Sequence, residues 1–163
     1  MAKSAAFPGS FDPPTLGHLN IIRRAAGIFG RLLVVVAENR QKKYLFTAEE
    51  RAEMLARMAA GYGNVEVKIC DSLIVDFLKK EGVGLLVRGL RGIDDFSYEF
   101  ELSTAYRTLD PGIETLFMAG DPKYFPLRSS LIKEIASFGG NVSGMVPPEV
   151  AGALGRKYGN GVE

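Results

Sequence analysis

Short apolar runs rich in β-branched residues alternate along this chain with stretches that repeat apolar residues at helical spacing. The five runs, which we expect to be strands, lie at 5–7, 31–37, 65–69, 85–88 and 113–118. Continuous apolar runs of this kind are typical of strands that are buried on both faces of a sheet. The alternation therefore predicts an α/β fold, a Rossmann-like, doubly wound, five-stranded parallel sheet with helices on both faces.

Helix signals fill the segments between these runs. Thr47 and Glu50 have the spacing of a capping box, and Gly82 stands where a helix should end. The expected helices span 18–29, a segment that opens after Thr47, 73–81, 94–109, 129–138 and a shorter stretch after Pro148. The apolar stripes expected on the first and fifth of them are Leu19, Ile22, Ala26 and Phe29, and Leu131, Ile135 and Phe138.

Length and charge limit what the chain can be. With 163 residues, of which 47% are hydrophobic, it is long enough for one good core and short for two. We therefore expect residues 1–163 to form a single domain with a frayed tail at 158–163. Twenty Lys and Arg against nineteen Asp and Glu leave a net charge of +1. So weak a field argues against a nucleic acid partner, but a small anionic ligand needs only a few focused cations.

The cysteine count and the apolar runs bear on the compartment. Cys70 is the only cysteine, so neither an intrachain disulfide nor a cysteine-based zinc site can form. The N-terminal residues show no hydrophobic region of a signal peptide. The longest apolar run, 32–37, is too short to span a bilayer. We expect a cytoplasmic protein without a membrane partner.

The segment 7–18 leads from the first expected strand into the first expected helix. Open parallel sheets bind ligands outside the carboxyl ends of their strands, at the topological switch point. Gly9 and Gly17 let the backbone approach a ligand closely, and the N-terminus of the following helix favours a phosphate. His18, the only histidine, can add a side-chain donor there, and Ser10 is placed to bind a second anion.

Two later loops carry cations. Lys42 and Lys43 follow the second expected strand, and Arg88 and Arg91 follow the fourth. Arginine suits phosphate recognition because its guanidinium is planar, permanently charged and able to bind with two N–H groups. The residues alone leave two alternatives open, since either lysine can reach a phosphate and the arginines can instead form structural ion pairs. The candidate partners in such pairs are Asp94, Asp95 and Glu99.

The string Thr15-Leu16-Gly17-His18 resembles the [His/Thr]-x-Gly-His signature of the nucleotidyltransferase superfamily. Pro8 to Pro13 together with Gly17-His18 is similar to the bacterial phosphopantetheine adenylyltransferase family, and the likeness extends over nearly the whole chain. The resemblance implies a single nucleotidyltransferase domain that transfers AMP from ATP to 4'-phosphopantetheine, giving dephospho-coenzyme A and pyrophosphate in coenzyme A biosynthesis. It also implies a homohexamer. From the residues themselves we expect Mg²⁺ to arrive bound to ATP, since the sequence shows no dedicated metal cluster and Mg²⁺ commonly binds phosphate oxygens and waters.

The same resemblance implies roles for individual residues. The implied catalytic residues are Ser10, His18, Lys42 and Arg88, and the implied acceptor-binding residues are Ser10, Lys42, Ile74 (through its backbone) and Arg88. The implied ATP-binding residues are Ser10, Phe11, His18, Gly89, Leu90, Arg91, Glu99, Tyr124, Arg128, Ser129 and Ser130. Arg128 replaces the first serine of the family's Ile-Ser-Ser-Ser string, and Tyr124 stands where many members carry Trp. The effect of these two departures on ATP binding stays open.

The residue inventory favours direct in-line transfer without a covalent intermediate. His18 is the only histidine, and no nucleophile is paired with a base in the sequence pattern. A phosphomonoester acceptor, with a second pKa of ~6, needs no general base. Two rivals remain: a nucleotidyltransferase acting on nicotinamide mononucleotide or glycerol 3-phosphate, and a non-catalytic nucleotide-binding module. The strings 88–91 and 98–99 are similar to those of the phosphopantetheine family and favour that acceptor.

Overall fold

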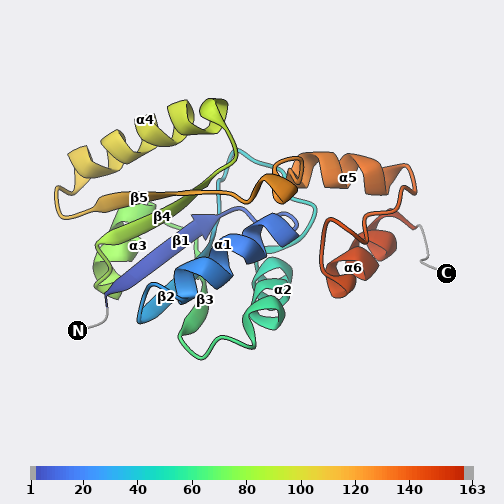
Figure 1. The fold of residues 1–163 in the computed structure, drawn as a ribbon, viewed down its shortest axis with the longest axis horizontal. Helices are drawn as coiled ribbons and strands as arrows, with labels where there is room; N and C mark the ends of the chain where they lie inside the picture. Colours follow the sequence, from blue (N-terminus) through green and yellow to red (C-terminus); the bar gives the residue numbers. More distant parts are fainter. Residues whose placement is uncertain (1–2, 160–163) are drawn as a thin grey trace.

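The computed structural model describes residues 3–159, and its strands and helices alternate as the sequence predicts (Figure 1). The strands are β1 (Ser4–Gly9), β2 (Arg31–Ala37), β3 (Val65–Cys70), β4 (Leu85–Leu90) and β5 (Glu114–Ala119). The helices are α1 (Leu16–Ala26), α2 (Ala48–Ala59), α3 (Ile74–Glu81), α4 (Ile93–Leu109), α5 (Ser129–Ser137) and α6 (Pro148–Tyr158), with a 3₁₀ turn η1 (Pro122–Tyr124) before α5.

All five strands run parallel in the order β3-β2-β1-β4-β5, which confirms the predicted doubly wound sheet. The chain builds outward from β1 to β3, then crosses back and continues from β4 to β5 on the other side. The switch point therefore lies between β1 and β4, where the loops after these two strands diverge to opposite faces. The predicted ligand site should lie at this crevice.

The sheet has a buried core on each face. Successive side chains of a strand point to opposite faces, so β2 sends Leu32 and Val34 to one side and Leu33 and Val35 to the other. The first pair packs under α1 and α2 in one hydrophobic cluster. The second pair packs in another cluster with residues of α3. All four strand side chains are fully buried, which explains why the run reads as continuously apolar.

The first helix differs from its prediction. α1 begins at Leu16 rather than at residue 18 because Thr15 caps it, and it ends at Ala26, with Gly27 as its C-cap. The helix therefore presents Asn20, Ile21, Ile22 and Ala25 to the interior, whereas Leu19 and Ala26 of the expected stripe are only partly buried. Phe29 is buried as expected, but it reaches the core from the loop beyond the helix.

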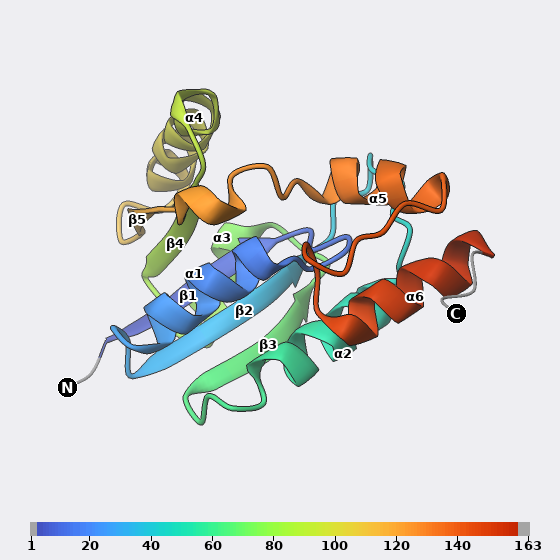
Figure 2. The ribbon, with the colours of Figure 1, turned by 45° about the vertical axis from the view of Figure 1, so that its right-hand side comes forward.

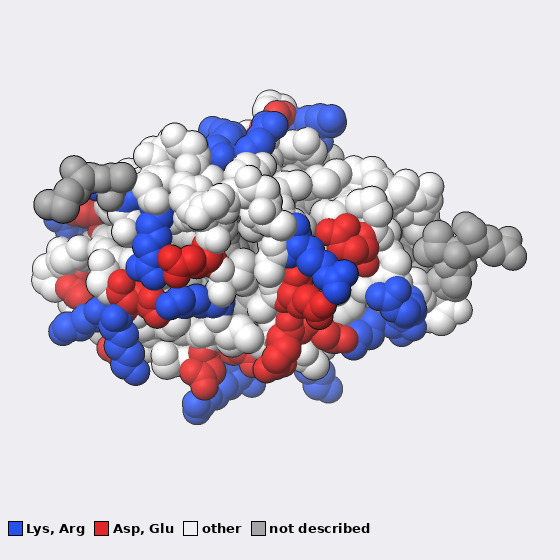
Figure 3. Space-filling view, turned by 90° about the horizontal axis from the view of Figure 1, so that it is seen from below, with Lys and Arg blue, Asp and Glu red and all other residues white. Residues whose placement is uncertain are grey.

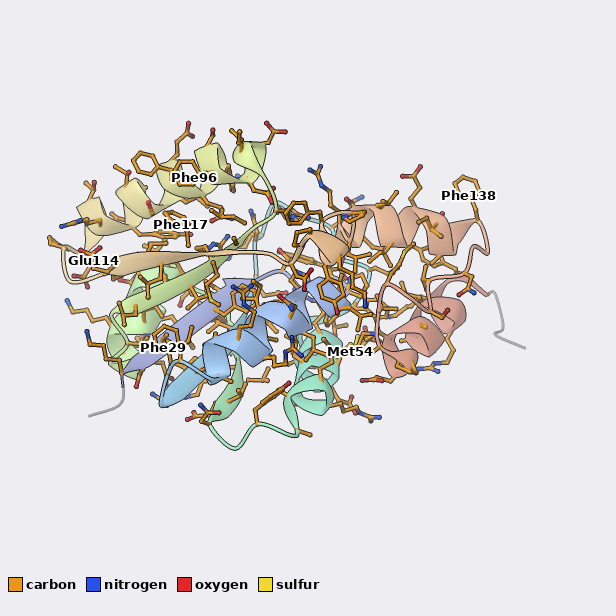
Figure 4. All side chains as sticks on the ribbon, in the orientation of Figure 1. Phe29, Met54, Phe96, Glu114, Phe117 and Phe138 are labelled. Atoms are coloured by element: carbon orange, nitrogen blue, oxygen red, sulfur yellow. The ribbon has the colours of Figure 1, made fainter. Side chains whose placement is uncertain are left out.

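The C-terminal helices form a third cluster beside the sheet, with α6 lying along α2 (Figure 2). Ile132 and Ala136 are the buried residues of α5, and Ile135 of the expected stripe packs partly buried against the same cluster, but Leu131 and Phe138 do not fit that stripe. Leu131 is 40% exposed and Phe138 is 86% exposed. The reason is that α5 packs against α6 through the face that carries Ile132 and Ala136. The helix also ends at Ser137, and Phe138 beyond it points away from the body (Figure 4).

Helix α4 lies against the β4–β5 edge and buries none of its residues. Phe96 of α4 and Phe117 of β5 meet edge to face between helix and strand, with ring centroids 5.4 Å apart (Figure 4). The rest of the helix leaves a row of large apolar side chains in solvent. The members of this row that exceed 40% exposure are Ile93, Phe96, Tyr98, Phe100 and Leu109, with Leu116 of β5 beside them.

The tail was predicted to fray from residue 158, but Tyr158 is the last residue of α6 and Gly159 caps that helix in the left-handed region, with φ 70°. Residues 160–163 lie outside the described residues.

Among the helices in residues 3–159, none combines the length and the apolar character needed to cross a membrane. On the face seen from below, basic and acidic side chains lie interspersed (Figure 3).

Candidate active site

A cleft of about 490 Å³ opens at the carboxyl ends of β1, β4 and β5, at the switch point of the sheet. Its walls come from the loops after these strands, from the loop after β2 and from the first turns of α1 and α5. The sequence-predicted residues that line this single cleft are Ser10, Phe11, His18, Lys42, Arg88, Gly89, Leu90, Arg91, Glu99, Tyr124, Arg128, Ser129 and Ser130. The fold thus brings together residues that are up to 120 positions apart in the chain.

Ile74 is the one predicted site residue that does not line the cleft. It is the first residue of α3, it is 7% exposed, and its side chain packs with Val75 and Leu78 in the core beneath the sheet. The burial of Ile74 concerns its side chain. The predicted contact to a ligand through its backbone therefore stays a prediction.

The turn after β1 is shaped by a close contact between Gly9 and Phe11. Phe11 has a φ of 49°, in the left-handed region, and its ring is only 2% exposed. A Cβ atom on Gly9 would lie 2.9 Å from that ring, so the position requires glycine. Because the ring of Phe11 is in the core, the main chain is the part of this residue that a ligand in the cleft can reach.

His18 is oriented by the cap of its own helix. Thr15 is the N-cap of α1, and its side-chain oxygen accepts a hydrogen bond from the His18 backbone N–H at 3.3 Å. In return the Nδ1 atom of His18 accepts from the Thr15 backbone N–H at 3.0 Å. An Nδ1 that accepts a hydrogen bond carries no proton, so the ring proton of the neutral imidazole resides on Nε2. The capping box thus fixes the tautomer and leaves Nε2–H as the ring's donor in the cleft.

The surroundings of His18 keep the ring neutral. Burial, with a smaller contribution from the positive charge of Arg91, lowers the pKa of His18 from 6.5 to about 4. The ring also stands edge-on to Phe11, with centroids 4.9 Å apart. At neutral pH the site therefore presents a neutral N–H donor beside a guanidinium, and both of them favour an anion.

The lysines after β2 are available to a ligand. Lys42 and Lys43 line the cleft, and neither side chain has a hydrogen-bond or ion-pair partner within residues 3–159. The backbone N–H of Lys42 donates to the carbonyl of Asn39 at 2.9 Å, which closes the loop on itself. Both lysines line the same cleft, so their place in its wall does not by itself choose between them.

The arginines after β4 are already paired. Arg88 donates from Nε and Nη2 to the two carboxylate oxygens of Glu99 at 2.5 and 2.6 Å, and from Nη1 to the Pro8 carbonyl at 2.8 Å. Arg91 makes a similar two-pronged pair with Asp95, at 2.8 and 3.0 Å. The structural ion pairs that the sequence left as an alternative are therefore present, and Glu99 meets an arginine rather than open space.

Pairing does not use up these arginines as ligand donors. A guanidinium has five N–H groups, and the hydrogen bonds of Arg88 occupy three of them, so two remain. For Asp95, burial works to raise the pKa, but hydrogen bonds from Arg91 and the positive charges of Arg91 and Arg128 outweigh it and hold the pKa below its usual value. The Asp95 carboxylate is therefore charged at neutral pH.

The start of α5 forms the opposite wall. Arg128 occupies the N-cap position and makes no side-chain cap, while Ser129 donates its hydroxyl to the Pro13 carbonyl at 2.8 Å instead of capping the helix. The first amides of α5 therefore have no side-chain cap at the cleft. Across the site, a Cβ atom on Gly17 would lie 3.5 Å from the Cβ of Tyr124, so the signature glycine and the tyrosine of η1 adjoin.

Two residues that the sequence reasoning passed over are central to the site. Asp12 is 5% exposed and accepts hydrogen bonds from the backbone N–H groups of Leu45 and Phe46 and from Lys133 at 2.7 Å. Lys133 also lines the cleft. The sequence did contain a signal for Lys133, because residues four apart on a helix share a face and Ser129 was already a predicted site residue. No local pattern could reveal the partners of Asp12, which lie 33, 34 and 121 positions away.

The fold and the cleft define the class: an α/β protein with a cation-lined cleft at the switch point of a parallel sheet. A family model described as cytidylyltransferase-like matches residues 6–135. The chain is 46% identical over 158 residues to the phosphopantetheine adenylyltransferase of Heliobacterium modesticaldum, covering 97% of this chain and 94% of that protein. The corresponding protein of Dictyoglomus thermophilum is 47% identical over 155 residues, covering 95% and 94%. The chain therefore belongs to the phosphopantetheine adenylyltransferase family of nucleotidyltransferases.

A similar fold occurs in a protein of known structure that is more distant in sequence. The crystal structure of a protein from Vibrio parahaemolyticus, described as a nicotinate-nucleotide adenylyltransferase, matches with a TM-score of 0.68 and 18% identity, covering 99% of this chain and 98% of that one. At this identity the likeness concerns the fold alone. A shared fold does not fix an activity, so the acceptor has to be argued from the site and the family.

Proposed function

We propose that this protein transfers AMP from ATP to 4'-phosphopantetheine, giving dephospho-coenzyme A and pyrophosphate. The observation that carries the proposal is the position of His18, a neutral N–H donor fixed by the cap of α1 at the switch-point cleft, with unpaired lysines on one side and guanidiniums on the other. A reaction between two anions needs that arrangement, because the protein has to hold them together and stabilise charge on one phosphorus.

The acceptor phosphate is held by cations from two loops in this mechanism. Lys42 approaches it as a mobile ammonium, and Arg88 uses the N–H groups that Glu99 and Pro8 leave free. Ser10, which lines the same cleft, orients the same phosphate. The acceptor oxygen then attacks the α-phosphorus of ATP in line with the departing pyrophosphate. The acceptor is already largely dianionic at neutral pH, so no base has to remove a proton.

The nucleotide lies along the other parts of the cleft. His18 donates from Nε2 to an α-phosphate oxygen as the five-coordinate state forms, and one preorganised donor of this kind is worth about 3–4 kcal/mol. The segment 89–91, Glu99, Tyr124 and the uncapped start of α5 at 128–130 surround ATP. At that start, Arg128 supplies a charge where the family has serine, which favours the polyphosphate.

Magnesium enters with the nucleotide in this proposal. Within residues 3–159, the His, Cys, Asp and Glu side chains form no group of three or more that could hold a metal ion. Mg²⁺ commonly keeps several waters and binds phosphate oxygens, so it can enter the cleft already bound to ATP. Its charge offsets that of the departing pyrophosphate, while the residues of the cleft position the two substrates.

We further propose that the protein works in the cytoplasm as a homohexamer. Cys70 is free and buried, which suits a reducing compartment. Helix α4 exposes Ile93 at 85% and Tyr98 at 62%, and burying such a row between copies would remove it from water. Light scattering of the purified protein tests the assembly, and a monomer in solution would contradict it.

A panel of acceptors tests the activity. Purified protein is incubated with MgATP and 4'-phosphopantetheine, nicotinamide mononucleotide or glycerol 3-phosphate, and the last is repeated with MgCTP. We expect pyrophosphate release with ATP and 4'-phosphopantetheine only, together with formation of dephospho-coenzyme A. Release with another acceptor would identify a different nucleotidyltransferase. Nucleotide binding without release in any arm would favour the non-catalytic module.

A further inference from the structure

The most deeply buried charge in the described chain belongs to a residue that the proposed mechanism does not use. Arg51, on α2, has a relative exposure of 0%. Burying a guanidinium is costly unless its donors are satisfied. Arg51 satisfies them in an unusual way, because most of its partners are backbone carbonyls of the loops that form the cleft.

The contacts of Arg51 join two of these loops. Its Nη1 donates to the carbonyl of Ser10, in the turn after β1, at 2.7 Å. Its Nε donates to the carbonyls of Phe46 and Thr47, where the loop after β2 ends, at 3.1 Å each. Its Nη2 pairs with the carboxylate of Glu38, where that loop begins. One planar group thus fixes both ends of the lysine loop against the turn that carries Ser10.

Tyr44 links Arg51 to the middle of the lysine loop. Its ring lies under the guanidinium of Arg51, with 4.1 Å between the guanidinium carbon and the ring centroid. Its hydroxyl accepts from the backbone N–H of Asn39 at 2.8 Å. The carbonyl of Asn39 in turn accepts from the backbone N–H of Lys42. A continuous path of contacts therefore runs from Arg51 through Tyr44 and Asn39 to Lys42.

We propose that Arg51 is a positioning residue for acceptor binding, which places Lys42 and Ser10 at a fixed separation across the cleft. The proposal rests on the acceptor role given to Lys42 above. Arg51 does not line the cleft itself, so its effect on substrate passes through the loop and the turn that it holds. A free lysine side chain can reach many places, and the anchored loop restricts where its stem begins.

The geometry explains why arginine is needed at this position. Three nitrogens in a rigid plane donate in three directions at once, toward 10, toward 46–47 and toward 38. Lysine carries the same charge on a single nitrogen and cannot span these acceptors. Arg51→Lys therefore keeps the charge on α2 but releases at least one end of the lysine loop.

The first test compares kinetics of matched variants. Losing hydrogen bonds from a charged donor typically costs enough to change binding about 10-fold, so Arg51→Lys should raise KM for 4'-phosphopantetheine by about that factor. KM for ATP should stay within about twofold. Tyr44→Phe, which removes only the hydroxyl, should give a smaller rise of about threefold. Arg57→Lys is the control, since Arg57 is on the same helix but 64% exposed and bound to Glu53.

A double-mutant cycle separates positioning from general damage. If Arg51 acts through Lys42, then Arg51→Lys should have little further effect on kcat/KM for the acceptor once Lys42→Ala is present. Additive losses in the double variant, or an equal rise in KM for both substrates, would overturn the proposal. Should Arg51→Lys fail to fold, the same cycle with Tyr44→Phe decides the question by the same criteria.

Amide hydrogen exchange gives a readout that does not depend on activity. Without substrates, Arg51→Lys and Tyr44→Phe should speed exchange at Asn39 and Lys42, while amides of β1 and β2 stay as slow as in the wild type. Unchanged exchange in this loop would overturn the positioning role. If the wild type fails to transfer AMP to 4'-phosphopantetheine, the proposed function falls, and the exchange data still decide whether Arg51 holds the loop.

Discussion

The two sides of the cleft present positive charge in different ways. On the β2 side, Lys42 and Lys43 have no side-chain partner in residues 3–159. On the β4 side, Arg88 and Arg91 are held by carboxylates of α4, and the side chains of Arg88 and Glu99 are only 18% and 13% exposed. The lysine side chains are therefore unpaired within residues 3–159, whereas the arginines are held in place by carboxylates that partly offset their charge.

One cleft can thereby let a substrate enter and leave and also hold its phosphate in a defined place. A mobile lysine loses side-chain entropy only when a ligand arrives, which suits a substrate that has to enter and leave. A guanidinium already fixed by a carboxylate has lost that entropy in folding, so it holds a phosphate in a defined place. Its pair also limits the positive charge that the empty cleft has to contain. Each side should therefore respond differently when a cation is removed.

His18 belongs to neither side, and its loss should have the largest effect. His18→Ala removes a donor that we expect to bind mainly the reacting α-phosphate, so kcat should fall by at least about 100-fold while both KM values change modestly. Steady-state kinetics with MgATP and 4'-phosphopantetheine measure this. A variant with normal kcat and a raised KM would contradict the role given to the ring.

The pH dependence of stability tests the link between His18 and the arginine side. The pKa of His18 is about 4 when folded and near 6.5 when unfolded, so below pH 6.5 the unfolded chain binds the extra proton. Stability is therefore complete above pH 6.5 and declines as the pH falls, by roughly 3 kcal/mol at pH 4. Urea unfolding of wild type and His18→Gln across this range isolates the term, because other acidic groups titrate in both. Parallel curves for the two proteins would refute it.

Removing one cation from each side should separate folding from binding. Arg88→Met leaves the carboxylate of Glu99 partly buried without its partner, so we expect a loss of about 2 kcal/mol in the free energy of unfolding as well as weaker acceptor binding. Lys42→Met has no pair to break and should leave stability unchanged. Thermal unfolding of both variants measures the contrast, and equal shifts in Tm would abolish the distinction drawn between the two sides.

The order of the elements and the location of the site were predictable from local patterns. Five apolar runs sufficed for the parallel sheet, and the Thr47–Glu50 spacing correctly marked the start of α2, where both capping hydrogen bonds are present. The stripes of α1 and α5 were right only in part, since Ile22 and Phe29 are buried but Leu131 and Phe138 are exposed, because the buried face of a helix is set by its neighbours. Asn20 of α1 is buried and Phe138 after α5 is exposed for that reason.

The interior of the site could be predicted only as a set of residues, since charge pairing depends on contacts between distant loops. Sequence alone could not decide whether Arg88 was free or paired, and it gave Arg51 no role, because the acceptors of Arg51 lie up to 41 positions away. Buried charges are satisfied by tertiary structure, which no local spacing encodes. The same limit left Lys42 and Lys43 equivalent.

The choice between those two lysines gives the smallest effect and the sharpest discrimination. Lys42→Ala should raise KM for 4'-phosphopantetheine by about 10-fold, the effect of losing one charge-assisted hydrogen bond, and should leave Tm unchanged. Lys43→Ala on the neighbouring position is the matched control and should change KM by less than about threefold. The expectation follows from the backbone bond that fixes Lys42 to Asn39 within the loop held by Arg51. If Lys43→Ala has the larger effect, Lys43 rather than Lys42 makes the acceptor contact on the β2 side of the cleft.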